Sequence, residues 1–245
     1  TQKGKCRYLL DKKVKLPELL GVVGLFCLIA LLVGILFCYV VGDGVKQFIF
    51  AGGLIVLLYP LLSYIRLSEV AVGLAFGPLL FGGVYYVMTG KIEPEPFILS
   101  IPSMIFTINL IYTDTFLDKD IDRAEGKRTL VNAFNSEKNA LSFQKIFLIF
   151  GYLSVFLIPV FDICDWEVFF VFLTVPLAID LIHSMEMYSE DTASVPNKKW
   201  YHFPFEAWSD IKENRSEPFM FRMYQARNLM IYSAIIISFF FKSLK

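Results

Sequence analysis

The stretch "FILSIPSMIFTINLIYTDTFLDKDIDRAEGKRTL", residues 97–130, joins a long apolar run to a group of acids. Residues 97–113 carry no charged side chain, and Asp114, Asp118 and Asp122 then follow at steps of four. A step of four advances an α-helix by about 400°, so each of these acids lies about 40° from the last. We therefore predict a membrane helix over 97–113 that continues out of the bilayer with one acidic stripe.

Six further apolar runs accompany this one. The chain has 245 residues, 56% of them hydrophobic and 19% charged, whereas a soluble domain is about a quarter charged. Apolar runs of about 17–25 residues can cross a hydrocarbon core of about 30 Å as helices. The seven runs are 17–41, 45–63, 68–89, 97–113, 141–161, 167–186 and 226–241. They predict a single all-α domain over 1–245, a multi-pass transmembrane helix bundle in the lipid bilayer, and they disfavour a soluble bundle.

Lysines and arginines gather in alternate connections between these runs. Residues 1–15, the connection that contains Arg66, the region from Lys119 to Lys145 and the segment 187–227 hold most of them. By the positive-inside rule, the aspartate stretch and the 187–225 segment face the cytoplasm. The formal net charge is zero, and we expect no nucleic-acid partner.

The acidic stripe favours a site for a hard cation. Mg²⁺ takes one or two protein carboxylates, keeps several waters and is completed by substrate phosphates. Lys127 and Arg128 lie a turn or so beyond the acids, where they can bind the remaining negative charge of a diphosphate. We therefore predict a lipid-linked diphosphate bound through Mg²⁺ to Asp114, Asp118 and Asp122. The plainer alternative is a charged loop where a helix leaves the membrane.

Two motifs give the chain a resemblance to a known family. "DKDIDRAEGKRTL" (118–130) resembles the second aspartate motif of the UbiA superfamily of intramembrane polyprenyltransferases, in the form of its menaquinone-pathway branch. "FGPLLFGGVYYVMTG" (76–90) is similar to the "FGP…YYV.TG" helix of that branch, and "SEVAVGLAFGP" (68–78) stands where the branch has a "GLGE" turn. The resemblance runs from about residue 7 to residue 186.

The resemblance implies a Mg²⁺-dependent prenyltransferase in a bacterial plasma membrane. Its donor would be an allylic polyprenyl diphosphate, and its aromatic acceptor 1,4-dihydroxy-2-naphthoate, with Asp118 and Asp122 as catalytic residues. Departure of the diphosphate would create an allylic cation, which an electron-rich aromatic ring attacks. A dry cavity keeps water from quenching that cation.

The chain departs from the family pattern at several positions. Asp114 stands where the family usually has Asn, while Tyr59 and Arg66 take the places of a Tyr and a basic residue that precede the "FGP" helix. Arg66 is thereby a diphosphate-binding candidate. The family's first motif, N-x-x-x-D-x-x-x-D, is not found before residue 17, where Asp11 stands alone. The resemblance therefore implies nine helices in the complete protein and two that precede those in this chain.

Five residues are weaker candidates for the acceptor or its cavity: Tyr59, Tyr85, Tyr86, Asp180 and His183. Tyr85 and Tyr86 lie in the "FGP" helix, where aromatic faces can stabilise a cation, although such residues more often pack or anchor a helix. Asp180 and His183 stand one turn apart near the end of run 167–186. They could orient or deprotonate the acceptor, or equally form a satisfied polar pair. The segment 187–225, with "WYHFPFEAW" (200–208), favours a surface anchor over a substrate lid.

Three other classes of protein share features with this chain. CDP-alcohol phosphotransferases also end a signature in D-x-x-x-D, but residues 90–113 lack the D-G-x-x-A-R element that precedes it. A transporter would place acids at the bilayer midplane and show a repeat between its halves, and neither is visible. An inactive membrane protein is the third alternative, if the first aspartate motif is truly lost.

Overall fold

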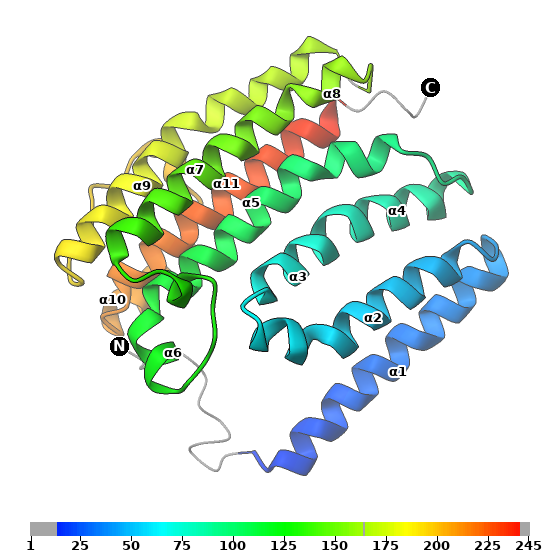
Figure 1. Cartoon of the computed structure of the whole chain (residues 1–245), viewed down its shortest axis with the longest axis horizontal. Coiled ribbons are helices and arrows are strands. Elements are labelled where there is room, and N and C mark those ends of the chain that lie inside the picture. The colour runs from blue at the N-terminus through cyan, green and yellow to red at the C-terminus, as the bar shows by residue number, and fades with distance from the viewer. Residues whose placement is uncertain (1–13, 164, 241–245) are drawn as a thin grey trace.

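The computed structural model describes residues 14–163 and 165–240, and every regular element within them is helical (Figure 1). Six helices there are long and apolar enough to cross a membrane, which confirms the predicted all-α, multi-pass fold. They are α1 (Leu16–Val40), α2 (Val45–Tyr64), the kinked helix Ser68–Thr89, α5 (Glu95–Leu117), the helix Glu137–Val160 and the helix Trp166–Glu190. Most of the basic N-terminal segment, with Asp11, lies outside the described residues.

Three of these spans are interrupted. The span Ser68–Thr89 consists of α3 (Ser68–Leu74), a π-helical turn (Ala75–Leu79) and α4 (Leu80–Thr89). The span Glu137–Val160 consists of α7 (Glu137–Val155) and α8 (Leu157–Val160). The span Trp166–Glu190 begins with a 3₁₀ segment (Trp166–Thr174) before α9 (Val175–Glu190). Short elements fill the connections: α6 (Lys119–Ala124), 3₁₀ turns at Val131–Ala133 and Trp200–His202, and α10 (Trp208–Glu213).

The seventh predicted run falls on α11 (Glu217–Phe239), which begins well before residue 226. Its first half carries Arg222, Gln225 and Asn228, and all three side chains are buried. These residues face protein rather than lipid, since α11 packs along α5, α9 and the Trp166–Thr174 segment. Because of their polarity the hydropathy pattern placed the start of the helix too late, and residues 217–225 belong to α11 rather than to the preceding connection.

The buried core lies among α5, α7, α9 and α11. α1 contributes no buried residue and α2 only Val45, and both lie beyond α3 and α4 on one side of the core (Figure 1). Their exposed side chains are mostly apolar, as expected for helices that contact lipid.

The helix α3 packs closely on α5 because of two glycines at helical spacing. A Cβ at Gly73 would lie 2.3 Å from Cγ1 of Ile108, and a Cβ at Gly77 would lie 2.6 Å from Cβ of Met104. At Gly77 the backbone also leaves helical geometry before Pro78. The position of α3 against α5 is therefore fixed by close contact, which matters for the site below.

The predicted continuation of α5 as one acidic helix is only partly correct. α5 ends at Leu117, Asp118 has non-helical dihedrals (φ −101°, ψ 8°), and α6 starts at Lys119. The carbonyl oxygen of Leu117, which would accept from Ile121 in a continuous helix, accepts the hydroxyl of Tyr188 at 3.2 Å. The acids still follow one another by turn contacts, because the Asp122 amide donates to the Asp118 carbonyl oxygen at 2.9 Å.

Candidate active site

The acids, α6 and the loop of residues 125–130 lie at the same end of the bundle, where α5 ends (Figure 1). Asp122 is buried, Asp114 and Asp118 are half-buried, and Asp120 is exposed. Lys127 Nζ donates to Oδ1 of Asp122 at 2.8 Å. This hydrogen bond raises the pKa of Lys127 above its ordinary value, so Lys127 carries its positive charge beside the acids.

The end of α2 and the start of α3, on either side of the connection that holds Arg66, each contact this loop. Oε1 of Glu69 accepts from the backbone N–H of Leu130 at 2.9 Å. The guanidinium of Arg128 lies 3.9 Å from the ring centre of Tyr64. The structure therefore brings the cationic pair Lys127 and Arg128 next to the connection that holds Arg66.

Arg66 is exposed and has a left-handed backbone, with φ 67°. Residues with a Cβ adopt this conformation rarely, and glycine adopts it freely. The arginine at this position therefore has a strained backbone. Such strain is often found at functional positions.

The acids fit a metal ion that arrives with a diphosphate. Across residues 14–163 and 165–240, no three acids, histidines or cysteines lie close enough together to hold a metal ion by themselves. Asp114, Asp118 and Asp122 thus do not form such a group of three in this structure; the helix breaks at Asp118, and Asp122 bonds Lys127. Mg²⁺ needs only one or two protein carboxylates and takes its other ligands from water and phosphate, and these carboxylates supply such ligands.

Two of the tyrosines predicted for the acceptor cavity, Tyr85 and Tyr86, lie far from the acids. The Tyr85 hydroxyl donates to Glu93, just before α5 begins, and the Tyr86 hydroxyl accepts from the backbone of Gly44 at 3.0 Å. The acids stand at the other end of α5, about 30–35 Å away for a helix of 23 residues. Tyr59 is exposed on α2, whose last residue, Tyr64, contacts Arg128.

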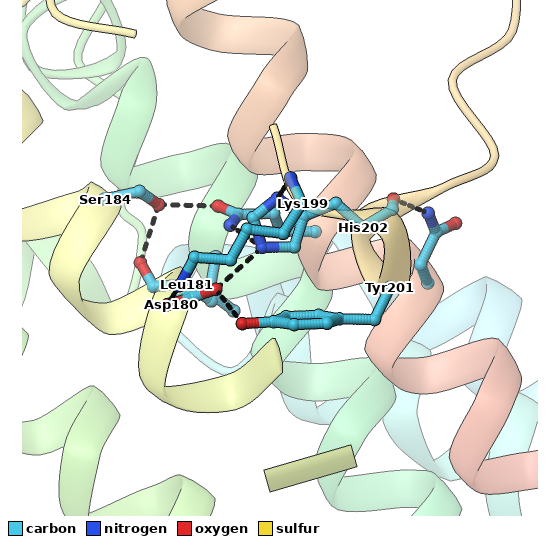
Figure 2. Close-up of polar contacts among 8 residues, drawn as sticks. Asp180, Leu181, Ser184, Lys199, Tyr201 and His202 are labelled. Carbon is cyan, nitrogen blue, oxygen red and sulfur yellow. Dashed lines mark hydrogen bonds and ion pairs between the residues drawn. The ribbon is translucent and has the colours of Figure 1, made fainter. Parts of the chain in front are cut away.

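Asp180 lies in a polar cluster, but its partner is not His183 (Figure 2). Oδ1 of Asp180 accepts from Lys199 Nζ at 2.8 Å; Oδ2 accepts from the Tyr201 hydroxyl at 2.7 Å and lies 2.8 Å from His202 Nε2. His183 is exposed one turn further along α9. Both residues line a pocket of about 390 Å³ with Lys199, His202 and Gln225.

The neighbours of His202 determine which of its ring nitrogens carries the proton. Nδ1 accepts from the backbone N–H of Lys199 at 3.3 Å, so Nε2 carries the proton and donates to Asp180. Burial lowers the pKa of His202, and its hydrogen bond to Asp180 offsets only part of that effect. With both ring nitrogens engaged, His202 has no free lone pair for deprotonating an acceptor, and the pair Asp180–His202 holds the segment after α9 in place.

Sequence reasoning missed Glu69, Tyr64 and His202. Glu69 is fully buried at the start of α3, and a signal for it existed. An ionisable residue at the edge of an apolar run is a functional candidate by default. The roles of Tyr64 and His202 depend on contacts with residues 64 and 22 positions away, and no local pattern indicates them.

The fold and the site define an integral membrane protein with acids and cations gathered at one end of a helix bundle. The model of the UbiA prenyltransferase family matches residues 2–209. The chain therefore belongs to this family and is a membrane prenyltransferase. No curated protein and no solved structure matches the chain.

Proposed function

We propose that the protein transfers a polyprenyl chain from an allylic diphosphate to an aromatic acceptor, with 1,4-dihydroxy-2-naphthoate as the favoured acceptor in menaquinone biosynthesis. Family membership supports the donor and the reaction class. The form of the motif at 118–130 supports the branch. The distribution of lysines and arginines supports a cytoplasmic position for the site.

One observation carries the proposal. The loop with Lys127 and Arg128 is attached both to the acids and to the connection that holds Arg66, through Lys127–Asp122, Arg128–Tyr64 and Leu130–Glu69. Three cations and three acids from distant parts of the sequence thus border one end of α5. A diphosphate needs cations, and its metal needs carboxylates.

In the proposed reaction the residues of this chain bind and orient the diphosphate. Asp118 and Asp122 would hold Mg²⁺, which when bound supplies Lewis acidity to the leaving diphosphate. Lys127 exchanges its hydrogen bond with Asp122 for a phosphate oxygen, and this exchange frees the Asp122 carboxylate at the same time. Arg128 and Arg66 bind the remaining phosphate oxygens. The carbon–oxygen bond breaks with its electron pair on the diphosphate, and the aromatic ring attacks the allylic carbon. The attacked ring carbon then loses its proton to the departed diphosphate, and the ring becomes aromatic again.

The proposal is tested with the full-length protein in lipid nanodiscs. A labelled allylic polyprenyl diphosphate is supplied with 1,4-dihydroxy-2-naphthoate or with 4-hydroxybenzoate, and prenylated product is measured by chromatography. We expect the naphthoate to be prenylated, Asp118→Ala and Asp122→Ala to abolish transfer, and both variants to remain inserted. Asp120→Ala is the matched control, because Asp120 is exposed on α6. Full activity in either of the first two variants contradicts the assigned site, and transfer to 4-hydroxybenzoate alone contradicts the branch.

A further inference from the structure

Glu69 is a buried carboxylate that the proposed reaction does not use directly. It lies in the first turn of α3 with no exposed surface. Burial of an ionised carboxylate costs several kcal/mol unless hydrogen bonds compensate it. Its position therefore calls for a contact that a neutral apolar residue could not make.

Both carboxylate oxygens of Glu69 accept hydrogen bonds. Oε2 accepts from the hydroxyl of the neighbouring Ser68 at 3.0 Å, and Oε1 accepts from the N–H of Leu130 at 2.9 Å. Leu130 directly follows Lys127, Arg128 and Thr129. The second bond thus joins α3 to the end of the cationic loop, across 61 residues of sequence.

The helix that carries Glu69 is itself held in place. Glu69 and Gly73 follow at a step of four and share one face of α3, and Gly77 follows in the π-helical turn after it. Gly73 and Gly77 press on Ile108 and Met104 of α5 at distances that leave no room for a Cβ. Glu69 therefore attaches the loop to a packed pair of helices, α3 and α5, and α5 is the helix that ends in the acids.

We propose that Glu69 is a positioning residue for diphosphate binding. It holds the backbone of the cationic loop at Leu130, so that Lys127 and Arg128 face the acids at the end of α5, and it does not touch the substrate. The loop has a second attachment, the packing of Arg128 on Tyr64, but that contact is made by a side chain that the substrate needs. The Glu69–Leu130 bond does not involve a side chain that the substrate needs. This inference rests on the proposed function.

The test compares variants at both ends of the hydrogen bond. Glu69→Ala removes the acceptor and Leu130→Pro removes the donor; the φ of Leu130, −60°, suits proline. Glu69→Gln keeps an acceptor oxygen, and Ser68→Ala removes the other bond to Glu69 without touching the loop. Each full-length variant is prepared in nanodiscs. Binding of inorganic pyrophosphate with Mg²⁺ is measured by calorimetry, KM and kcat by prenyl transfer, and exchange of the Leu130 amide by hydrogen–deuterium exchange.

A hydrogen bond to a charged acceptor corresponds to about a 10- to 100-fold change in an equilibrium constant. We expect Glu69→Ala and Leu130→Pro to raise the pyrophosphate Kd and the KM for the allylic diphosphate by about that factor, with kcat and the KM for the acceptor little changed. The double variant should be no worse than either single one, since both remove the same bond. Glu69→Gln and Ser68→Ala should behave nearly as the wild type, and Leu130 should exchange faster in Glu69→Ala.

Three results would overturn the inference. They are unchanged pyrophosphate binding in Leu130→Pro and Glu69→Ala, additive losses in the double variant, or equal loss in Glu69→Gln and Glu69→Ala. If Glu69→Ala fails to fold, the comparison of Leu130→Pro with Glu69→Gln decides. If the wild-type protein neither binds pyrophosphate nor transfers a prenyl chain, the proposed function itself is contradicted. If the wild type binds pyrophosphate and the variants bind it equally well, only the role of Glu69 is contradicted.

Discussion

A single substitution at Arg66 should raise stability and lower substrate affinity together. The backbone of Arg66 is left-handed, with φ 67°, which costs a residue with a Cβ about 1–2 kcal/mol. Glycine avoids this cost but loses about 0.5–1 kcal/mol more conformational entropy on folding than alanine. Arg66→Gly should therefore raise the free energy of unfolding by about 0.5–1 kcal/mol, which corresponds to about 1–4 °C in Tm for a chain of this size.

The same substitution removes a guanidinium beside the cationic loop. If Arg66 binds the diphosphate, the lost hydrogen bond to a charged acceptor corresponds to about 1.5–3 kcal/mol, or about 10- to 100-fold in KM for the allylic diphosphate. The KM for the acceptor should stay near its wild-type value. Stability and affinity should thus move in opposite directions.

Arg66→Ala is the matched control, because it removes the same guanidinium and keeps the left-handed strain. Thermal unfolding in detergent micelles should place the Tm of Arg66→Gly above that of Arg66→Ala, while both variants share a raised KM. Arg66→Lys should keep most of the affinity. A Tm for Arg66→Gly at or below that of Arg66→Ala would refute the strain argument, and an unchanged KM in both would refute the role in binding.

Three further predictions follow from other contacts of the structure. Tyr64→Ala should raise the KM for the diphosphate by about two- to fivefold, since Arg128 loses the ring beneath it; Tyr64→Phe should match the wild type, and equal KM values for both variants would contradict this. Arg222→Leu should lower the free energy of unfolding by about 3 kcal/mol or more, because the carbonyl oxygens of Ser184, Ser194 and Pro218 lose their buried donor. A fall in Tm no larger than that of Arg222→Lys would count against this prediction. Burial lowers the pKa of His202 below 6.5, so His202 stays neutral in the folded protein while the unfolded chain takes up a proton as pH falls through about 6.5, and the stability of the segment after α9 declines. Limited proteolysis of the wild type should therefore cleave that segment faster at acidic pH, and no acceleration would contradict the prediction.

The apolar runs predicted most of the fold because membrane helices are selected for length and composition together. α1, α2 and α5 begin or end within a few residues of their runs. The errors occur where the surroundings of a helix are protein and not lipid. α11 begins early because Arg222 donates to the Ser184 carbonyl oxygen and Gln225 accepts from the Ser184 hydroxyl inside the bundle. A hydropathy pattern cannot distinguish a polar residue with such partners from one in a loop.

The spacing of the acids predicted their proximity along the chain but not the break at Asp118. That break coincides with the contact of Tyr188 with the last carbonyl oxygen of α5, and this contact joins positions 71 residues apart. The same limit applies to Glu69, whose partner lies 61 residues away. Helical periodicity indicates which residues share a face, whereas the contacts that shape this site connect the ends of different helices.

At Asp180, a contact between distant parts of the sequence changes the functional prediction. The spacing of Asp180 from His183 suggested a base for the acceptor, because residues three apart lie on one face of a helix. The histidine that Asp180 bonds is His202, which is buried and has both ring nitrogens engaged. His202 in that state holds a segment in place, and its Nδ1 cannot take a proton without giving up the hydrogen bond from the Lys199 N–H. In the proposed reaction the diphosphate that leaves at the acids is itself a base, so it is an acceptor for the ring proton that does not depend on this pair.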